Sequence, residues 1–452
     1  MNRMVRGAMG ATLAFLCCLA LAASLSCSGD KNVPVFVMLQ LNTVGNSGNL
    51  NNPQQLHDQL QKLKSAKVEG VMVDAWFGIV ELQENHYNWK PYQTLADMCS
   101  NLGLKLHLVM SFHQCGGNTG DACDIPLPPW VLAKEGIWYT DNEGNENKEY
   151  ISLFADHLPV FEGGRTPVQV YADYIQSFSE TFKDHIGSTV TGIEVSLGPA
   201  GEMRYPSYPL SRWTFCGVGE FQCYDRNAVT AFANYSASKG HPEWNAPPSN
   251  AGGYNDRLGP NTPFFNDGGY NSDYGRWFLE WYSGALLAHG YEILSSARKS
   301  VPASSGCDVT AKVAGIHWWY KSPSHPAELT AGYYNTNGND AYGDISKMFA
   351  KVGVSLDFTC LEMQDSAQEP SCECGPFELV EQVQHAAFSN GVDFVGENAL
   401  PRYDETAYST IEARSCYNGK PIKHFTYLRL CNTLLSSNNF NTFGQFVDAM
   451  SG

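Results

Sequence analysis

The sequence predicts an α/β protein built as a (β/α)8 TIM barrel, with long βα loops forming the active face. Three observations support this prediction. Short, almost continuously apolar runs alternate with helical patterns along the chain, as expected for strands buried on both faces of a parallel sheet. There are eight such runs. The two longest connections, 114–167 and 199–269, each follow an apolar run, where a barrel places its functional loops. An open doubly wound sheet is the competing arrangement.

Each apolar run has the length of a strand, and a helix fits between most neighbouring runs. The runs are 33–41, 70–77, 105–113, 190–197, 311–318, 354–362, 392–400 and 424–430. Helical patterns cover 54–66, 92–102, 168–185, 270–299, 345–352, 377–390 and 442–450. Because no low-complexity linker divides the chain, we expect residues 30–452 to form a single domain.

Residues 1–29 show the order of charged, apolar and small residues that is typical of a secretory signal peptide. Arg3 and Arg6 precede an apolar run over 11–25, which is short for a membrane span. A retained signal anchor is the alternative. We expect a secreted protein, or one in the lumen of the secretory pathway, with no membrane attachment after signal removal.

The cysteine content supports the same expectation. Of 14 cysteines, three lie in or at the edge of this segment (Cys17, Cys18 and Cys27) and the other 11 follow it. Such a number suits an oxidising compartment, in which disulfides persist. The neighbouring Cys372 and Cys374 are both expected to form bridges to residues elsewhere in the chain.

The charge and aromatic content narrow the class of ligand. The formal net charge of −17 disfavours nucleic acid and anionic membranes as partners, since either would be repelled. A neutral or cationic ligand fits better. The chain holds 10 Trp, 23 Tyr and 23 Phe, whose flat faces suit sugar rings but equally suit a large core.

Two glutamates stand just past predicted strands in unusual surroundings. Glu202 lies in GPAGEMRYPSYP (198–209), and Glu397 lies in GENALPRYD (396–404). Polar residues also close most of the other runs, namely Asp74, His113, His317, Thr359, Glu362, Asn398 and Arg429. The carboxyl ends of barrel strands converge on one face. Two carboxyls that meet there are the minimum equipment for cleaving a glycosidic bond by acid and base.

Seven motifs resemble those of the β-amylases, the inverting, exo-acting α-1,4-glucan hydrolases of glycoside hydrolase family 14. They are VMVDAWFG (71–78), MSFHQCGGNTGD (110–121), GPAGEMRYPSYP (198–209), KVAGIHWWYK (312–321), FTCLEMQD (358–365), GENALPRYD (396–404) and TYLRL (426–430). The resemblance runs from about Val33 to the C-terminus. It implies a (β/α)8 barrel that hydrolyses starch, glycogen or maltodextrin from non-reducing ends and releases β-maltose.

The same resemblance implies individual roles. Glu202 is expected to be the general acid and Glu397 the general base, with their carboxyls roughly 6.5–9.5 Å apart to admit a water molecule. The expected substrate contacts are Asp74, His113, Asp121, Lys312, His317, Thr359, Asn398, Ala399 and Arg429. For Lys312, a role in stabilising developing charge and a role in a buried ion pair both remain open.

Neither a cofactor nor a metal is expected, because inversion needs no metal and neither His113 nor His317 has a carboxylate at helical ligand spacing. Cys115 and Cys360, which stand beside pocket residues in the matching motifs, are expected to be unpaired thiols. The alternative function is that of a catalytically silent relative that binds maltodextrin.

Overall fold

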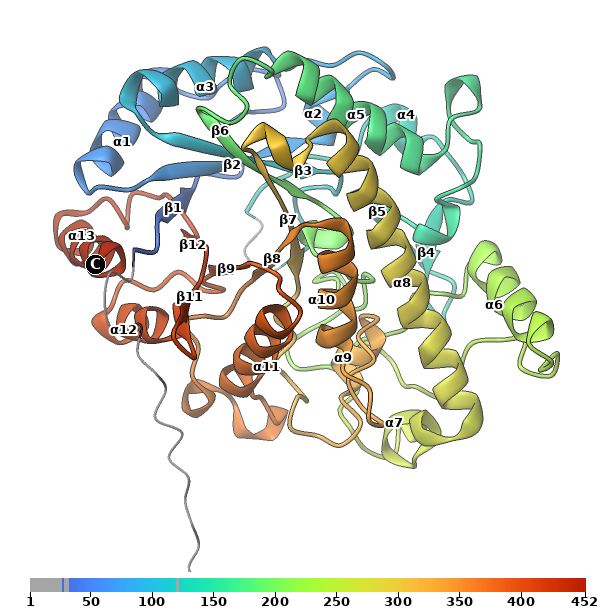
Figure 1. Ribbon diagram of the computed structural model, residues 1–452. Helices are drawn as coiled ribbons and strands as arrows, with labels where there is room; N and C mark the ends of the chain where they lie inside the picture. Colours follow the sequence, from blue (N-terminus) through green and yellow to red (C-terminus); the bar gives the residue numbers. More distant parts are fainter. Residues whose placement is uncertain (1–26, 28–31, 119–121) are drawn as a thin grey trace, which may run out of the picture.

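Eight parallel strands close into a barrel, which confirms the predicted fold class (Figure 1). The computed structural model describes residue 27, residues 32–118 and residues 122–452. The barrel strands are β1 (Val35–Met38), β2 (Gly70–Trp76), β3 (Lys105–Ser111), β6 (Val190–Val195), β7 (Asp308–Val313), β8 (Ser355–Phe358), β9 (Phe394–Glu397) and β12 (His424–Tyr427). Around the barrel they follow the order β1-β12-β9-β8-β7-β6-β3-β2, which closes on itself.

The strands form where the apolar runs predict them, because both faces of each strand are buried. All residues of β1, β2, β8, β9 and β12 are buried. The fifth strand is the exception, since β7 begins three residues before the predicted run, 311–318, and ends five residues before its end. Ile316 and Trp318 are buried in the loop that follows β7, so their apolar character indicates burial and not strand structure.

Eight helices surround the barrel and cover the outer faces of its strands (Figure 1). They are α1 (Pro53–Ser65), α3 (Lys90–Leu102), α5 (Pro167–Thr181), α8 (Asp273–Ser300), α10 (Ala341–Val352), α11 (Pro376–Ser389), α12 (Glu405–Arg414) and α13 (Ser437–Ser451). The sequence patterns miss α12. Its buried face consists of Ala407, Tyr408, Ile411 and Arg414, a set with too few apolar residues to give a clear helical period.

The long βα connections contain short elements of their own. The loop after β3 carries α4 (Pro129–Leu132) and a hairpin of β4 (Trp138–Thr140) with β5 (Glu146–Ile151). The loop after β6 carries α6 (Arg226–Ser238), α7 (Pro263–Asn266) and several single turns. Short helices α2 (Phe77–Val80) and α9 (Pro326–Thr330) follow β2 and β7, and β10 (Cys416–Tyr417) pairs with β11 (Lys420–Pro421) before β12.

The barrel interior changes from apolar to charged along its axis. Near the amino ends of the strands, Phe36 stacks on His107. The next layer consists of Met38, Met72 and Val109, which form their own apolar cluster. Toward the carboxyl ends, ionisable side chains replace the apolar ones, namely Asp74, Glu194, Lys312, Asp357 and Glu397. The apolar layers support the barrel, and the charged layer lies at the end that carries the long loops.

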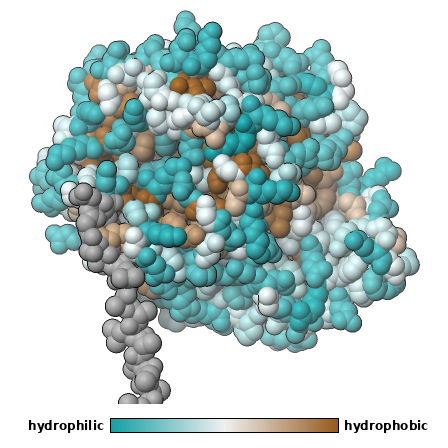
Figure 2. Space-filling model, viewed as in Figure 1, coloured by the Kyte–Doolittle hydropathy of each residue, from teal (hydrophilic) through white to brown (hydrophobic). Residues whose placement is uncertain are grey.

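The face shown in Figure 2 is mostly hydrophilic, with hydrophobic side chains in small groups between polar ones. Within the described chain, no helix combines the length and the apolar character that a bilayer crossing requires. The expected signal peptide over 1–29 lies outside the described residues except for Cys27, which forms a disulfide with Cys416.

Candidate active site

A cavity of about 440 Å³ opens at the carboxyl ends of the strands, where the long loops meet. Six of the predicted site residues line it, namely Glu202, Lys312, His317, Thr359, Ala399 and Arg429. Aromatic side chains form part of its wall, namely Tyr208, Trp213, Phe215 and Trp318. Polar groups beside flat apolar faces suit a sugar chain, because each pyranose ring presents hydroxyls at its rim and C–H bonds on its faces.

Glu202 reaches this cavity from the loop that follows β6. The turn before it has positive φ at Ala200 and Gly201. A side chain at Gly201 would meet the His113 ring at 3.3 Å, so the close approach of this turn to β3 favours glycine. Beyond the turn, the Met203 amide donates to the Lys312 carbonyl at 2.8 Å, which fastens the loop to the barrel. These contacts fix the position from which Glu202 enters the cavity.

The Glu202 carboxyl is oriented by a buried arginine. Arg204 Nε donates to Glu202 Oε2 at 2.6 Å, and the Tyr208 hydroxyl lies 3.5 Å from the same oxygen. The Arg204 guanidinium also lies 3.9 Å from the centre of the Tyr208 ring and donates from Nη2 to Asn118 Oδ1 at 2.9 Å. Held by three partners, Arg204 presents Glu202 to the cavity in one orientation.

Glu397 has different surroundings at the end of β9. It is only 1% exposed and forms an ion pair with Lys312, which reaches across from β7. Glu194 and Asp357 are also buried, and oxygens of the three carboxyls lie within 4.8 Å of one another. Burial raises the pKa of Glu194 to about 7, and burial together with the charges of Glu397 and Glu194 raises the pKa of Asp357 well above its usual value.

One cation therefore serves three buried carboxyl groups. The raised pKa values of Glu194 and Asp357 favour retention of a proton by this pair, and the remaining negative charge can pair with Lys312. The three oxygens have the spacing of a metal site, but the Lys312 ammonium already supplies a positive charge beside Glu397. The shared proton and the Lys312 ammonium together offset two of the three negative charges.

Two predicted sugar contacts are buried beside the cavity instead of lining it. Asp74 accepts a hydrogen bond from Ser111 Oγ at 2.9 Å, and burial raises its pKa while the positive charge of Arg429 opposes the rise. His113 Nδ1 lies 2.9 Å from Ser196 Oγ, and burial lowers the pKa of His113 to about 3. A neutral His113 can donate one hydrogen bond and accept another, as contact with a sugar hydroxyl requires.

His317 lines the cavity from the loop after β7. Burial lowers its pKa to about 4, so the ring is neutral at physiological pH. Its Nδ1 is buried and has no hydrogen-bond partner within the described chain. The Phe215 ring lies 5.9 Å away. A buried ring nitrogen without a partner, in the wall of a cavity, is suited to contact a ligand hydroxyl.

The remaining predicted contacts cluster after β8, β9 and β12. Asn398 does not point its amide into the cavity, because Nδ2 donates to the carbonyls of Leu428 and Leu400 while Oδ1 accepts from the Leu428 amide. It therefore joins the ends of β9 and β12. Thr359 and Ala399 line the cavity, and Arg429 Nη1 donates to the Leu39 carbonyl at 3.1 Å. Asp121 lies outside the described residues.

Three residues that shape the site were not singled out by the sequence patterns. Glu194 and Asp357 are carboxylates inside apolar strand runs, and an acidic residue in a strand buried on both faces is the signal that could have found them. Arg204 stands within the Glu202 motif. Glu362 was expected only as a polar residue at the end of an apolar run. Its carboxylate accepts hydrogen bonds from the backbone amides of Ala399 and Leu400 at 3.0 and 2.7 Å. No pattern in the sequence indicates this loop contact.

The cysteine predictions are partly wrong. Cys115 is not an unpaired thiol, because it pairs with Cys123 in the loop after β3. Cys360 is free, buried and part of the cavity wall, as expected. Cys372 pairs with Cys216, whereas Cys374 is free. The spacing of the two cysteines alone did not show that only one of them would have a partner in reach.

Comparisons with known proteins agree with this geometry. The model of glycosyl hydrolase family 14 matches residues 36–452. β-Amylase 2, chloroplastic, of Oryza sativa subsp. japonica is 47% identical over 431 residues, which cover 93% of this chain and 77% of the relative. The β-amylase of Vigna unguiculata is also 47% identical, over 93% of this chain and 88% of its own. The crystal structure of the β-amylase catalytic domain of Paenibacillus polymyxa superposes with a TM-score of 0.79 at 31% identity, covering 94% of this chain and 99% of that one.

The comparisons contradict the expected secreted location. Similar proteins from Oryza sativa and Arabidopsis thaliana are named chloroplastic, which points to a plastid. The cysteine argument for secretion is also weakened by the structure. Among the described cysteines, three disulfides stand beside six free thiols, so the number of cysteines overstated the need for an oxidising compartment.

The barrel, the cavity at its carboxyl end and the match over 36–452 lead to one conclusion. The chain belongs to glycosyl hydrolase family 14, the β-amylases, and is a glycoside hydrolase that degrades starch by acting on its α-1,4-glucan chains.

Proposed function

We propose that Glu202 is the general acid and Glu397 the general base of hydrolysis that proceeds with inversion and releases β-maltose. The observation that supports this assignment most strongly is the difference between the two carboxyls. Glu202 lines the cavity on a loop, while Glu397 is buried at a strand end beside Lys312. An inverting enzyme needs one carboxyl that donates a proton and one that remains ionised.

The barrel order supports approach from two sides of a sugar. β6, which precedes Glu202, and β9, which ends at Glu397, are separated by β7 and β8 in the closed sheet. In the proposed reaction, protonated Glu202 gives its proton to the glycosidic oxygen while Glu397 removes a proton from water attacking the opposite face of the ring. A carboxyl separation of roughly 6.5–9.5 Å would leave room for that water.

Lys312 is the ion-pair partner of Glu397 in this scheme. Its ammonium pairs with Glu397, while Glu194 and Asp357 retain a proton between them. A carboxylate that stays charged in a buried layer can act as a base, because the ion pair offsets the loss of hydration. Two roles were open for Lys312, namely ion pairing and electrostatic support of the reaction. In this scheme its contact with Glu397 performs both.

The other matched residues would hold the glucan chain. Asp74, His113 and Asp121 are proposed contacts for the non-reducing end, and Lys312, His317, Thr359, Ala399 and Arg429 for the units around the cleaved bond. Asn398 would act through the chain ends it joins, since its amide is fully engaged with Leu428 and Leu400. Among the described residues, both carboxyls needed for catalysis are present, so nothing favours the catalytically silent alternative.

Polarimetry of a starch digest tests the proposal. Fresh maltose released by the enzyme should show the optical rotation of the β-anomer and then mutarotate upward. Release of the α-anomer would refute inversion. Release of glucose, or of a ladder of mixed oligosaccharides, would refute removal of maltose units from chain ends.

A further inference from the structure

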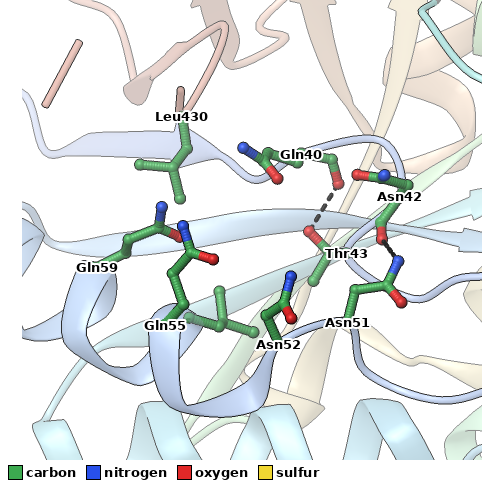
Figure 3. A pocket seen from close by; sticks show the side chains of 9 residues that line it. Gln40, Asn42, Thr43, Asn51, Asn52, Gln55, Gln59 and Leu430 are labelled. Carbon is green, nitrogen blue, oxygen red and sulfur yellow. Dashed lines mark hydrogen bonds between the residues drawn. The ribbon is translucent and has the colours of Figure 1, made fainter. Parts of the chain in front are cut away.

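A second, smaller hollow lies at the end of β1, beside the start of α1 (Figure 3). Its volume is about 110 Å³. Its lining residues are Gln40, Asn42, Thr43, Asn51, Asn52, Gln55, Leu56, Gln59 and Leu430. Six of these nine side chains are amides, one is a hydroxyl and two are leucines. Because no charged side chain lines the hollow, it has no preference for an ionic ligand.

The local sequence explains how so many amides meet. Gln55 and Gln59 are four residues apart, which places their side chains on one face of α1, and Asn52 directly precedes the first residue of this helix. Leu60 and Leu63 lie on the face that packs into the core. The loop after β1 then folds over the helix, bringing Gln40 to the opposite side of the hollow (Figure 3).

Two of the polar side chains hold the loop in place. Thr43 Oγ1 donates to the Gln40 carbonyl at 2.6 Å, and Asn51 Nδ2 donates to the Asn42 carbonyl at 2.7 Å. These bonds explain Thr43 and Asn51 as structural residues. They do not explain the other five amides.

The other five side chains are exposed or half-exposed and make no hydrogen bond within the described chain, so their amides are open to a ligand as well as to water, namely Gln40, Asn42, Asn52, Gln55 and Gln59. Figure 3 shows the amides of Gln55, Gln59 and Asn52 directed toward the space below Gln40 and Leu430. Gln54, one residue away on another face of the helix, bonds to Asp58 at 2.9 Å. The amides that make no hydrogen bond within the described chain are therefore gathered at the hollow, whereas a glutamine elsewhere on the same helix has a partner.

Asn52 provides a further indication. It precedes the first residue of α1, a position where an asparagine side chain ordinarily accepts a hydrogen bond from the helix. Here it makes no such bond, and its backbone is left-handed, with φ 45° and ψ 62°. The Asn52 amide is therefore not engaged by the helix end.

The hollow also adjoins the active cavity. Arg429, which lines the cavity, donates to the Leu39 carbonyl. The residues that follow each of these two, Leu430 and Gln40, line the hollow. The hollow and the cavity are therefore lined by adjacent residues of the same two chain segments.

We propose that this hollow binds a glucosyl unit of the polysaccharide outside the catalytic cavity. Amides offer donors and acceptors in pairs, which matches neighbouring sugar hydroxyls that each donate and accept. Leu56 and Leu430 offer an apolar surface to the C–H face of the ring. The proposal rests on α-glucan as the substrate, and it assigns these amides to retention of long or branched chains.

The test compares two double variants of α1 on the Glu202→Gln background, which prevents turnover of the probe. Gln55→Ala with Gln59→Ala removes two amides from the hollow. Gln54→Ala with Gln61→Ala removes two exposed glutamines from the same helix outside it. Both changes raise helix propensity alike. Glycogen affinity is measured from mobility in native gels that contain increasing glycogen.

The dissociation constant for glycogen should rise about tenfold in the first pair, as expected for two lost hydrogen bonds, and less than about twofold in the second. Gln40→Ala, on the loop side of the hollow, should weaken binding in the same direction. Equal affinities in the two double variants, with folding confirmed by thermal unfolding, would overturn the proposal.

Turnover of maltopentaose by the wild-type active site separates this inference from the proposed function. With Glu202 intact, both double variants should cleave this short substrate at wild-type kcat. If the wild-type protein fails to cleave it while the glycogen affinities still differ, the catalytic assignment fails and the binding site stands. If it cleaves maltopentaose and the glycogen affinities are equal, the binding site fails and the catalytic assignment stands.

Discussion

The two glutamates of the site occupy regions that are built in different ways. The Glu202 carboxyl is 15% exposed on a loop, and its orientation comes from neighbours within its own segment, chiefly Arg204 and Tyr208. Glu397 is 1% exposed on a strand, and its partners come from three other strands. The difference teaches that two carboxyls at the same face of one barrel can be held in place in two different ways. Glu202 is oriented toward the cavity, whereas Glu397 belongs to a buried group of ionisable side chains.

The largest expected effect comes from removing each carboxyl without changing its shape. Glu202→Gln and Glu397→Gln should each lower kcat on starch by about 10³–10⁴-fold, since each removes one partner of acid–base catalysis. Both variants should still bind maltodextrin, as measured by calorimetry. An activity within tenfold of wild type in either variant would contradict the assigned pair.

Replacement of the shared cation should affect stability as well as rate. Lys312→Met leaves three buried carboxyls without their positive partner, so we expect a loss of about 3–5 kcal/mol in the free energy of unfolding. Urea denaturation measures this loss. Gln54→Ala, at an exposed helix position, is a suitable control and should change stability by less than about 0.5 kcal/mol. A Lys312→Met protein as stable as wild type would show that the carboxyl layer does not need its cation.

The pH dependence of stability should report the shared proton. Because the pKa of Glu194 is raised to about 7 in the folded protein, the folded state binds more protons than the unfolded state between about pH 4.5 and 7. Its contribution to stability is therefore present at low pH and is lost as the pH rises through about 7. Glu194→Gln should flatten this slope by at most about 1.4 kcal/mol per pH unit. Thermal unfolding across this range measures it, and unchanged slopes would contradict proton sharing.

The smallest expected effect concerns a loop contact beside the Glu397 region. Glu362 accepts two backbone amides through its two oxygens, and Glu362→Gln keeps only one good acceptor. We expect kcat/KM on maltopentaose to fall about tenfold as Ala399 and Leu400 lose their fixed position. Glu362→Asp, which keeps both oxygens, should recover part of the loss. Equal activity in all three proteins would show that this loop needs no such support.

Much of the fold followed from local chemistry. Strands that are buried on both faces must be apolar throughout, so the eight runs marked the barrel and its carboxyl ends. The prediction was wrong where apolar character had another cause, as in the loop after β7, or where a short helix buried few apolar residues, as in α12. The Glu202 neighbourhood was partly visible too, because Arg204 and Tyr208 lie within six residues of Glu202.

The sequence by itself determined the barrel strands and the candidate residues at their ends, since residue types and their places can be read along one segment at a time. Tertiary structure alone decided which of them share charge. Lys312 on β7 meets Glu397 on β9 across β8, and Glu194 and Asp357 join them from β6 and β8. The physical reason is that Coulomb interaction and burial depend on distance in space. Closure of the barrel brings these residues together, although more than 200 positions separate Glu194 from Glu397 along the chain.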